Sequence, residues 1–259
     1  MNWGEYLQAI RSDGAAVLDA GRKGLDPEVP STPGWTVRDV IAHLGQVHRQ
    51  KTHIVRELLV DEAPDFSDFA LRGDDSLLEW FAEGLHELTA VLSVADPATH
   101  VHTWHEPDQT VGFWIRRMAH ETVIHRVDAE LGHGAPTPVN PILGADGVDE
   151  ILTTFMEGYP PWAEVTRSPV AVRLESEGRS WNVRFLSWTG TSPNSGKAFD
   201  DEAGIELEAD GPSPNAVVRG SGDALDLFLW GRGSADGLVT EGHPSVLLYL
   251  RDVAASSTG

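Results

Sequence analysis

The segment Thr110–Leu131 constrains the fold of this chain most, because it combines a helical repeat with a line of ionisable side chains. On a helix that turns by about 100° per residue, Arg117, His125 and Asp128 all lie within about 40° of Glu121. Apolar residues flank this line on both sides, so it faces a protein interior. Buried charges must be paired, hydrogen-bonded or bound to a metal. The segment therefore predicts a helix with a buried polar stripe.

Two interpretations of this stripe stay open on the helix alone. Glu121 and His125 are one helical turn apart, so a carboxylate oxygen and an imidazole nitrogen can bind one metal ion. Alternatively, Arg117 with Glu121 and His125 with Asp128 form ion pairs that serve only packing. The pattern E-x-x-x-H does not decide, because so short a motif has many chance matches. HETVIH is not the zincin motif H-E-x-x-H, because Ile124 stands where the second histidine would be.

The arginines of this segment have different expected roles. Arg116, Arg126 and Glu130 fall on the side of the helix opposite the stripe, where we expect solvent. Arg126 is interpreted as a surface or inter-domain residue. Arg117 lies on the stripe, where pairing with Glu121 is the first interpretation. The second is a bidentate contact with a substrate carboxylate.

Composition excludes several classes of function. A chain of 259 residues with 41% hydrophobic content favours two globular domains. The net charge of −21 argues against nucleic acids and anionic membranes as partners. There is no cysteine, so any sulfur chemistry needs a thiol from outside. The N-terminus does not resemble a signal peptide and no apolar run reaches about 20 residues, so a cytoplasmic protein is expected.

Three further segments carry apolar residues at helical spacing, and together with residues 110–131 they predict a four-helix bundle. Their ranges are 2–22, 36–60 and 76–92. Thr36 has the place of an N-cap, with Asp39 three residues later in a capping-box arrangement. Residues 61–75 are expected to form a loop that borders a pocket.

The helix at 36–60 offers histidines for a metal site between facing helices. His43 lies at the edge of its apolar arc, His48 inside the arc, and His53 on the polar side. Position alone does not choose between His43 and His48. Two ligands from residues 110–131 and one histidine from this helix would leave an open position, as a catalytic zinc site requires.

The remaining histidines are expected to lie outside the site. His100, His102 and His105 fall in a Pro-bounded loop and are expected at the surface, with His105 nearest the following helix. His243 is expected to be structural.

The second half of the chain has a different pattern. The Gly/Pro-rich segment 132–141 predicts a linker between a first domain at 1–135 and a second at 142–259. Helices are predicted at 145–156, 223–230 and 245–253, and strands at 170–176, 181–188, 204–210 and 215–221. This half predicts an α+β domain with an antiparallel sheet. It contains no phosphate-binding Gly loop and no G-x-S-x-G motif.

Two stretches together resemble a known family. GWTVRDVIAHLGQVHR and FWIRRMAHETVIHRVDAE are similar to the second- and fourth-helix signatures of the mycothiol-dependent maleylpyruvate isomerase family, which belongs to the DinB-like bundles. NAVVRGSGDALDLFLWGR and EGHPSVLLYLR are similar to the smaller, sterol-carrier-like α+β domain behind that bundle. The resemblance implies a divalent metal, usually zinc, held by His43, Glu121 and His125. It thereby favours His43 over His48.

The resemblance also implies mycothiol as the thiol cofactor or co-substrate, which agrees with the lack of cysteine. A metal with an open position can bind a thiol and lower its pKa. The thiolate would then serve isomerisation or S-transfer on a small electrophile. Asp128, one turn beyond His125, is expected to accept a hydrogen bond from the other imidazole nitrogen. The expected partners are therefore a small-molecule substrate and a low-molecular-weight thiol.

Two alternatives differ in the use of the metal. The first is a non-catalytic bundle, stabilised by metal, that binds a small ligand or a partner. The second is a metal hydrolase that activates water where the thiol would bind. Turnover that needs mycothiol favours the isomerase or transferase, turnover without thiol the hydrolase, and binding without turnover the non-catalytic protein.

Overall fold

The computed structural model describes residues 1–72, 76–209 and 213–258. The chain forms two compact units, Met1–Pro138 and Val139–Gly259. The boundary between them lies inside the Gly/Pro-rich segment 132–141. Among the described residues, no helix is long and apolar enough to cross a membrane.

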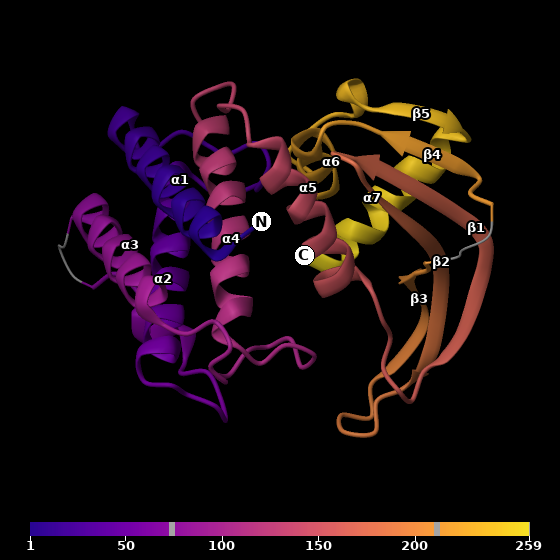
Figure 1. Ribbon diagram of the computed structural model, residues 1–259, viewed down its shortest axis with the longest axis horizontal. Coiled ribbons are helices and arrows are strands. Elements are labelled where there is room, and N and C mark those ends of the chain that lie inside the picture. The colour runs from indigo at the N-terminus through magenta and orange to yellow at the C-terminus, as the bar shows by residue number, and fades with distance from the viewer. Residues whose placement is uncertain (73–75, 210–212, 259) are drawn as a thin grey trace. The chain divides into compact units, whose positions relative to one another are not determined.

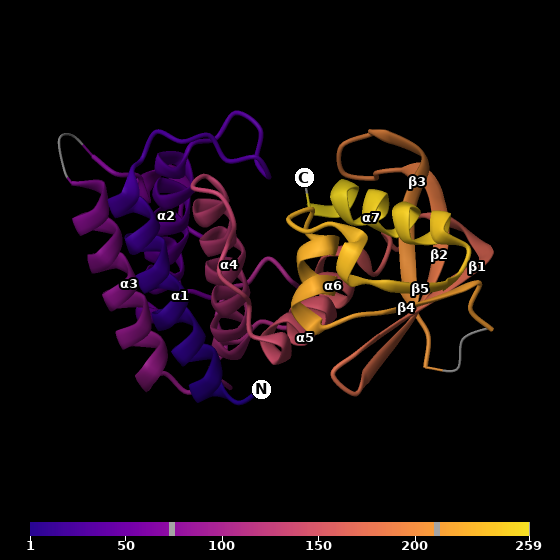
Figure 2. The same cartoon turned by 90° about the horizontal axis from the view of Figure 1, so that it is seen from above.

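The first unit contains the four predicted helices, which lie side by side (Figures 1 and 2). They are α1 (Trp3–Lys23), α2 (Val37–Arg56), α3 (Leu77–Val94) and α4 (Val111–Leu131). The predicted helical bundle is therefore confirmed. α2 ends four residues earlier than predicted, and Leu58 just beyond it has a positive φ of 51°.

The predicted capping box at the start of α2 is present. The Thr36 hydroxyl accepts from the Asp39 backbone N–H at 3.4 Å, and the Asp39 carboxylate accepts from the Thr36 backbone N–H at 2.8 Å. These bonds satisfy two backbone donors that a helix N-terminus leaves without partners. The cap fixes where α2 begins, and hence which of its side chains face α4.

Residues 61–72, the described part of the loop predicted at 61–75, are mostly irregular, with one short 3-10 helix, η1 (Phe66–Phe69). Residues 73–75 lie outside the described part of the chain. Two side chains of α2 attach the segment to the bundle. The Gln46 amide donates to the Phe66 carbonyl at 2.6 Å, and the Gln50 amide donates to the Pro64 carbonyl at 2.7 Å.

The prediction that Arg126 and Glu130 face solvent is wrong. Both are buried, with 2% and 9% of their surface exposed. Arg126 donates to Asp13 of α1 at 3.1 Å, to Glu130 at 2.8 Å and to the Thr137 hydroxyl at 2.7 Å. The chain folds back after α4 and covers this side of the helix, which a helical projection cannot foresee. Arg116, predicted on the same side, is half-buried.

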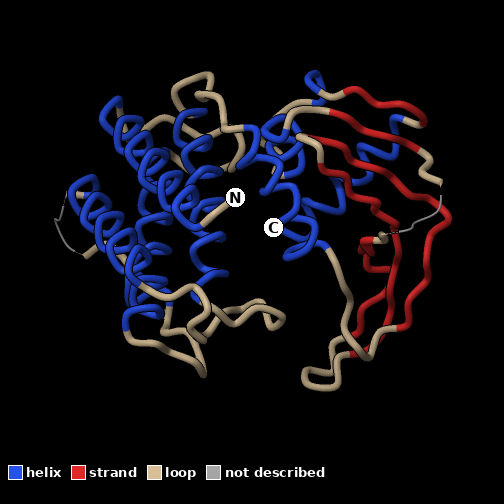
Figure 3. Tube along the Cα trace, in the orientation of Figure 1, coloured by secondary structure: helices blue, strands red, loops and turns tan. Residues whose placement is uncertain are grey.

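The second unit is a five-stranded sheet with helices packed on one face (Figure 3). Its strands are β1 (Glu164–Ser176), β2 (Arg179–Thr191), β3 (Ala198–Leu207), β4 (Ala216–Arg219) and β5 (Val239–Gly242), in the order β3-β2-β1-β4-β5. Its helices are α5 (Pro141–Glu150), the π-helix η2 (Ile151–Met156), α6 (Gly222–Leu229), the 3-10 helix η3 (Ala235–Gly237) and α7 (Pro244–Thr258). The predicted α+β class is confirmed.

Two features of the sheet differ from the prediction. β4 pairs with β1 in parallel, so the sheet is mixed, whereas its other three pairings are antiparallel. β5 was not predicted, because its four residues are mostly exposed and show no apolar alternation. The first helix also begins earlier than predicted, with Asn140 as its N-cap and Pro141 at a position that suits proline. Residue 210, the end of one predicted strand, lies outside the described residues.

Candidate metal centre

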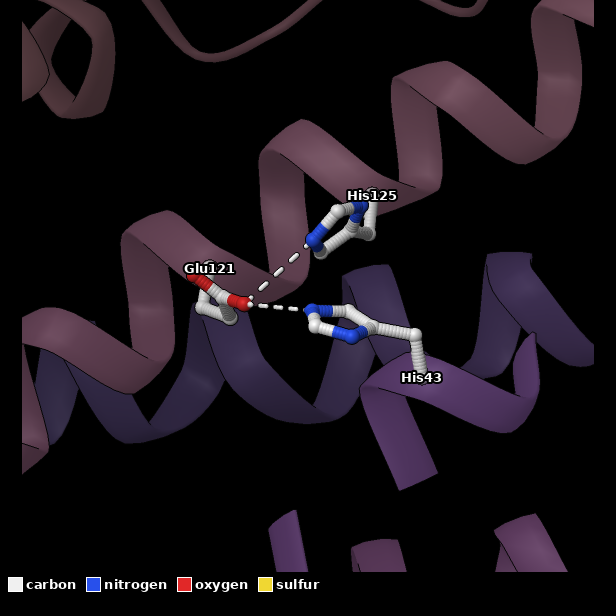
Figure 4. A group of neighbouring side chains, drawn as sticks. All are labelled: His43, Glu121 and His125. Carbon is white, nitrogen blue, oxygen red and sulfur yellow. Dashed lines mark ion pairs between the residues drawn. The ribbon is translucent and has the colours of Figure 1, made fainter. Parts of the chain in front are cut away.

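Three side chains from α2 and α4 converge on one point in the bundle. Glu121 Oε1 lies 3.5 Å from His43 Nε2 and 3.3 Å from His125 Nε2. Figure 4 shows both imidazole nitrogens directed at this oxygen. The three ligand atoms all lie within 4.8 Å of one another. Atoms bound to one tetrahedral zinc at about 2.0–2.1 Å lie roughly 3.4 Å apart, so the arrangement has the dimensions of a metal site.

The three side chains differ in exposure. His125 and Glu121 have 12% and 16% of their side-chain surface exposed, whereas His43 has 32%. The rings of Trp35 and Phe66 lie beside His43, with centroids 5.2 Å and 5.8 Å from its own. The centre is therefore reached from the His43 side, along an aromatic border to which the segment 61–72 contributes.

Asp128 contacts the imidazole nitrogen of His125 that does not face Glu121. Its Oδ2 lies 3.0 Å from His125 Nδ1, and its Oδ1 accepts from the Ser31 hydroxyl at 2.6 Å. Asp128 is fully buried, so this carboxylate stays in place. Because a carboxylate accepts, Nδ1 carries the hydrogen and Nε2 is the nitrogen available to a metal.

We expect Asp128→Ala to weaken zinc binding by about 10- to 100-fold, because partners of metal-bound histidines contribute to affinity on this scale. A titration with zinc against a chelator measures the effect. Asp19→Ala removes an exposed carboxylate of α1 and serves as the matched control. Equal affinity in the Asp128→Ala variant and the wild type would reject the orienting role.

Arg117 is buried and donates to Glu121 Oε2. This is the first of the two interpretations from the sequence. Burial opposes ionisation of Glu121, but Arg117 and hydrogen bonds from His125 and His43 outweigh it, so the pKa of Glu121 lies well below its usual range. Glu121 is therefore a carboxylate, the form that binds metals.

Zinc affinity is expected to fall as the pH drops below about 9. Burial lowers the pKa of His125, but hydrogen bonds to Asp128 and Glu121 raise it more, to about 9. Metals bind neutral imidazole, so zinc must displace the Nε2 proton, and each pH unit from about 9 to 7 should cost about tenfold in affinity. Zinc titrations across this range measure the slope. An affinity independent of pH would contradict the assignment of His125.

In the metal-free protein, the same raised pKa links His125 to folding. Its folded pKa of about 9 exceeds the ordinary value of 6.5. The stabilisation from its charged form is therefore complete below about pH 6.5 and is lost as the pH rises through about 9.

His48 lies apart from this centre. It is fully buried, stacks near Phe81, and its Nε2 lies 3.0 Å from the Thr122 hydroxyl. Because Thr122 donates its own proton to the Met118 carbonyl, His48 Nε2 must be the donor. Burial lowers the pKa of His48 to about 3, so the ring is neutral. His48 is a core residue.

The loop histidines also lie away from the three ligand atoms. His105 stacks on Phe113 with centroids 5.6 Å apart, His100 is exposed and His102 is half-buried. His243 is exposed on the second unit.

Lys51 of α2 was not predicted as a site residue. Its Nζ lies 4.7 Å from the Trp114 ring centroid. Burial lowers the pKa of Lys51 to about 8; the negative charge of Glu121 acts in the opposite direction, and the positive charge of Arg117 lowers the pKa further. The amine thus lies within electrostatic reach of the centre. A single lysine does not form a recognisable sequence motif. The one feature of the sequence that relates Lys51 to the site is its position on the same helix as His43.

The fold and the site define a two-domain protein with a candidate metal centre in its helical bundle. The family model described as the mycothiol maleylpyruvate isomerase N-terminal domain matches residues 7–130, and the MDMPI C-terminal domain matches residues 143–248. The chain belongs to the mycothiol-dependent maleylpyruvate isomerase family.

Solved structures agree on the fold. The crystal structure of a mycothiol-dependent maleylpyruvate isomerase has a TM-score of 0.59 at 15% identity, over 93% of each chain. A histidine-to-alanine mutant of that enzyme has a TM-score of 0.61 at 14% identity, also over 93% of each chain. A comparison with curated proteins finds no match.

Proposed function

We propose that this protein is a zinc-dependent enzyme that uses mycothiol, or a similar low-molecular-weight thiol, to isomerise or conjugate a small electrophile of the maleylpyruvate type. The observation that carries the proposal is the convergence of His43, Glu121 and His125 at distances that suit one zinc ion. Three protein ligands leave a fourth position for an incoming group. Membership of the family supports mycothiol as that group.

The donor set fits a divalent metal. Two imidazole nitrogens and one carboxylate oxygen are a known catalytic ligand set for zinc. His43, Glu121 and His125 would hold the ion, and Asp128 would fix the orientation of His125. A zinc ion bound here would lower the pKa of a thiol and keep it as thiolate.

The chain's own residues supply the rest of the site. Arg117 keeps Glu121 ionised and oriented through its contact with Oε2. The rings of Trp35 and Phe66 border the approach at His43. In isomerisation, the thiolate sulfur of mycothiol adds to the activated carbon–carbon double bond, and the resulting single bond rotates. Elimination then restores the double bond and releases the thiol unchanged.

The test is a turnover assay with zinc-loaded protein, mycothiol and maleylpyruvate. We expect isomerisation, or formation of a thiol conjugate with a related electrophile, only when zinc and thiol are both present. Turnover that continues without thiol would contradict the proposal and favour a metal hydrolase. Zinc binding without any turnover would favour a non-catalytic binding protein.

A further inference from the structure

Lys51 is half-buried, and its amine is a cation that has no acidic partner in the described part of the chain. Within residues 1–72, 76–209 and 213–258 it forms no ion pair, and its described contacts are the Gln50 side-chain oxygen and the face of Trp114. An ammonium group has three donors, so two stay available. A partly desolvated cation of this kind favours an anion as its partner.

Glu121, the carboxylate whose charge reaches Lys51, is already engaged. It directs Oε1 at His43 and His125, and it accepts from Arg117 on Oε2. The charge of Lys51 is therefore left for another group.

The amine is held in place by its surroundings. The Gln50 amide donates to the Pro64 carbonyl at 2.7 Å and presents its oxygen to Lys51. The Trp114 indole donates to the His102 carbonyl at 2.8 Å, which fixes the ring against which the amine lies. Such positioning lowers the entropy cost of binding a ligand group.

Lys51 also differs from the other lysines of the chain. Lys23 and Lys197 are exposed at the surface, whereas Lys51 is half-buried. It lies on α2 about two turns, or about 12 Å, beyond His43. With a divalent ion bound, the charges of the ion, Arg117 and Lys51 exceed those of Glu121 and Asp128. The centre then favours an anionic ligand in a protein whose net charge is −21.

We infer that Lys51 is a specificity-determining residue that binds a carboxylate of the substrate beside the metal centre. The inference rests on the proposed function and adds to it the residue that selects acids over neutral electrophiles. A small acid held at Lys51 by its carboxylate would extend toward the centre, where the thiol would bind.

The test measures binding of maleate, and of its neutral dimethyl ester, to the full chain by isothermal titration calorimetry with and without zinc. The variants are Lys51→Met, which keeps the length of the side chain but not its charge, and Lys51→Arg, which keeps a charge. Lys23→Met is the matched control at an exposed lysine. Zinc content and thermal unfolding of each variant are measured alongside, and both should match the wild type.

We expect Lys51→Met to bind maleate about 10- to 100-fold more weakly, the scale of a hydrogen bond to a charged group. Lys51→Arg should retain most of the affinity, and Lys23→Met all of it. The dimethyl ester should not distinguish the variants. Equal maleate affinity in Lys51→Met and the wild type would overturn the inference, as would a wild type that does not bind maleate.

These outcomes separate the two proposals. Maleate binding that depends on Lys51, in a protein without thiol-dependent turnover, would leave the inference standing and refute the proposed function. Thiol-dependent turnover, together with maleate binding that Lys51→Met does not change, would support the proposed function and refute the inference about Lys51.

Discussion

Glu121→Ala is expected to lose its bound zinc and, with it, thiol-dependent turnover. The substitution removes one of three ligands and the negative charge that lies between His43 and His125. It also removes the carboxylate to which the buried Arg117 donates, so a positive charge near the site loses this acceptor. Metal analysis of the dialysed protein, followed by the turnover assay, measures both losses.

The companion variants decide which histidine of α2 binds the metal. His43→Ala and His125→Ala should lose zinc as Glu121→Ala does, whereas His48→Ala should keep it. Loss of zinc in His48→Ala, together with retention in His43→Ala, would reverse the choice of ligand.

Arg126→Met should lower the free energy of unfolding by about 3–5 kcal/mol, because removing one partner of a buried ion pair leaves uncompensated charge. Arg126 is 2% exposed and contacts both Asp13 and Glu130, so a half-buried and a buried carboxylate would lose their shared cation. Its contact with Thr137, which attaches the chain after α4, would also be lost. Urea-induced unfolding followed by far-ultraviolet circular dichroism measures the change.

An exposed arginine offers the matched control for this experiment. Arg22 pairs with Asp19 on α1, and their side chains are 63% and 68% exposed. Arg22→Met should change stability by less than about 1 kcal/mol, since exposed ion pairs contribute little. An Arg126→Met variant as stable as Arg22→Met would show that the buried network does not hold the bundle together.

The burial of Arg126 shows why sequence periodicity described one side of α4 and not the other. The apolar residues around Glu121 and His125 recur at helical spacing, so the inward stripe follows from the pattern. The covering of Arg126 depends on the path of residues 132–138, for which no periodicity exists. A helical projection of α4 uses only the residues of that helix, so it cannot predict which side another segment will cover.

The strands, too, could be predicted only where the sequence has a local pattern of alternating residues. β1 and β2 contain alternating buried residues and were predicted from them. The parallel pairing of β4 with β1 results from a long-range connection, and the short β5 carries no alternation. Strand pairing therefore needed three-dimensional information.

The candidate site was partly predictable for similar reasons. Glu121, His125, Arg117 and Asp128 share one helix, so their proximity follows from helical geometry alone. By their positions on the helix, His43 and His48 were equally good candidates for a metal ligand. The packing of α2 against α4 distinguishes them. His43 meets Glu121, whereas His48 meets Thr122 one residue further along α4. The sequence placed Lys51 on the helix of His43 but did not indicate a role for it, because the charges of Glu121 and Arg117 come near it only when α4 packs against α2.

The most direct test of the metal centre is an anomalous diffraction map from a crystal of the zinc-loaded protein, recorded at the zinc absorption edge. The account predicts one strong peak at about 2.0–2.2 Å from His43 Nε2, His125 Nε2 and a Glu121 oxygen. A peak bound by other residues, or no peak among these three side chains, would contradict it.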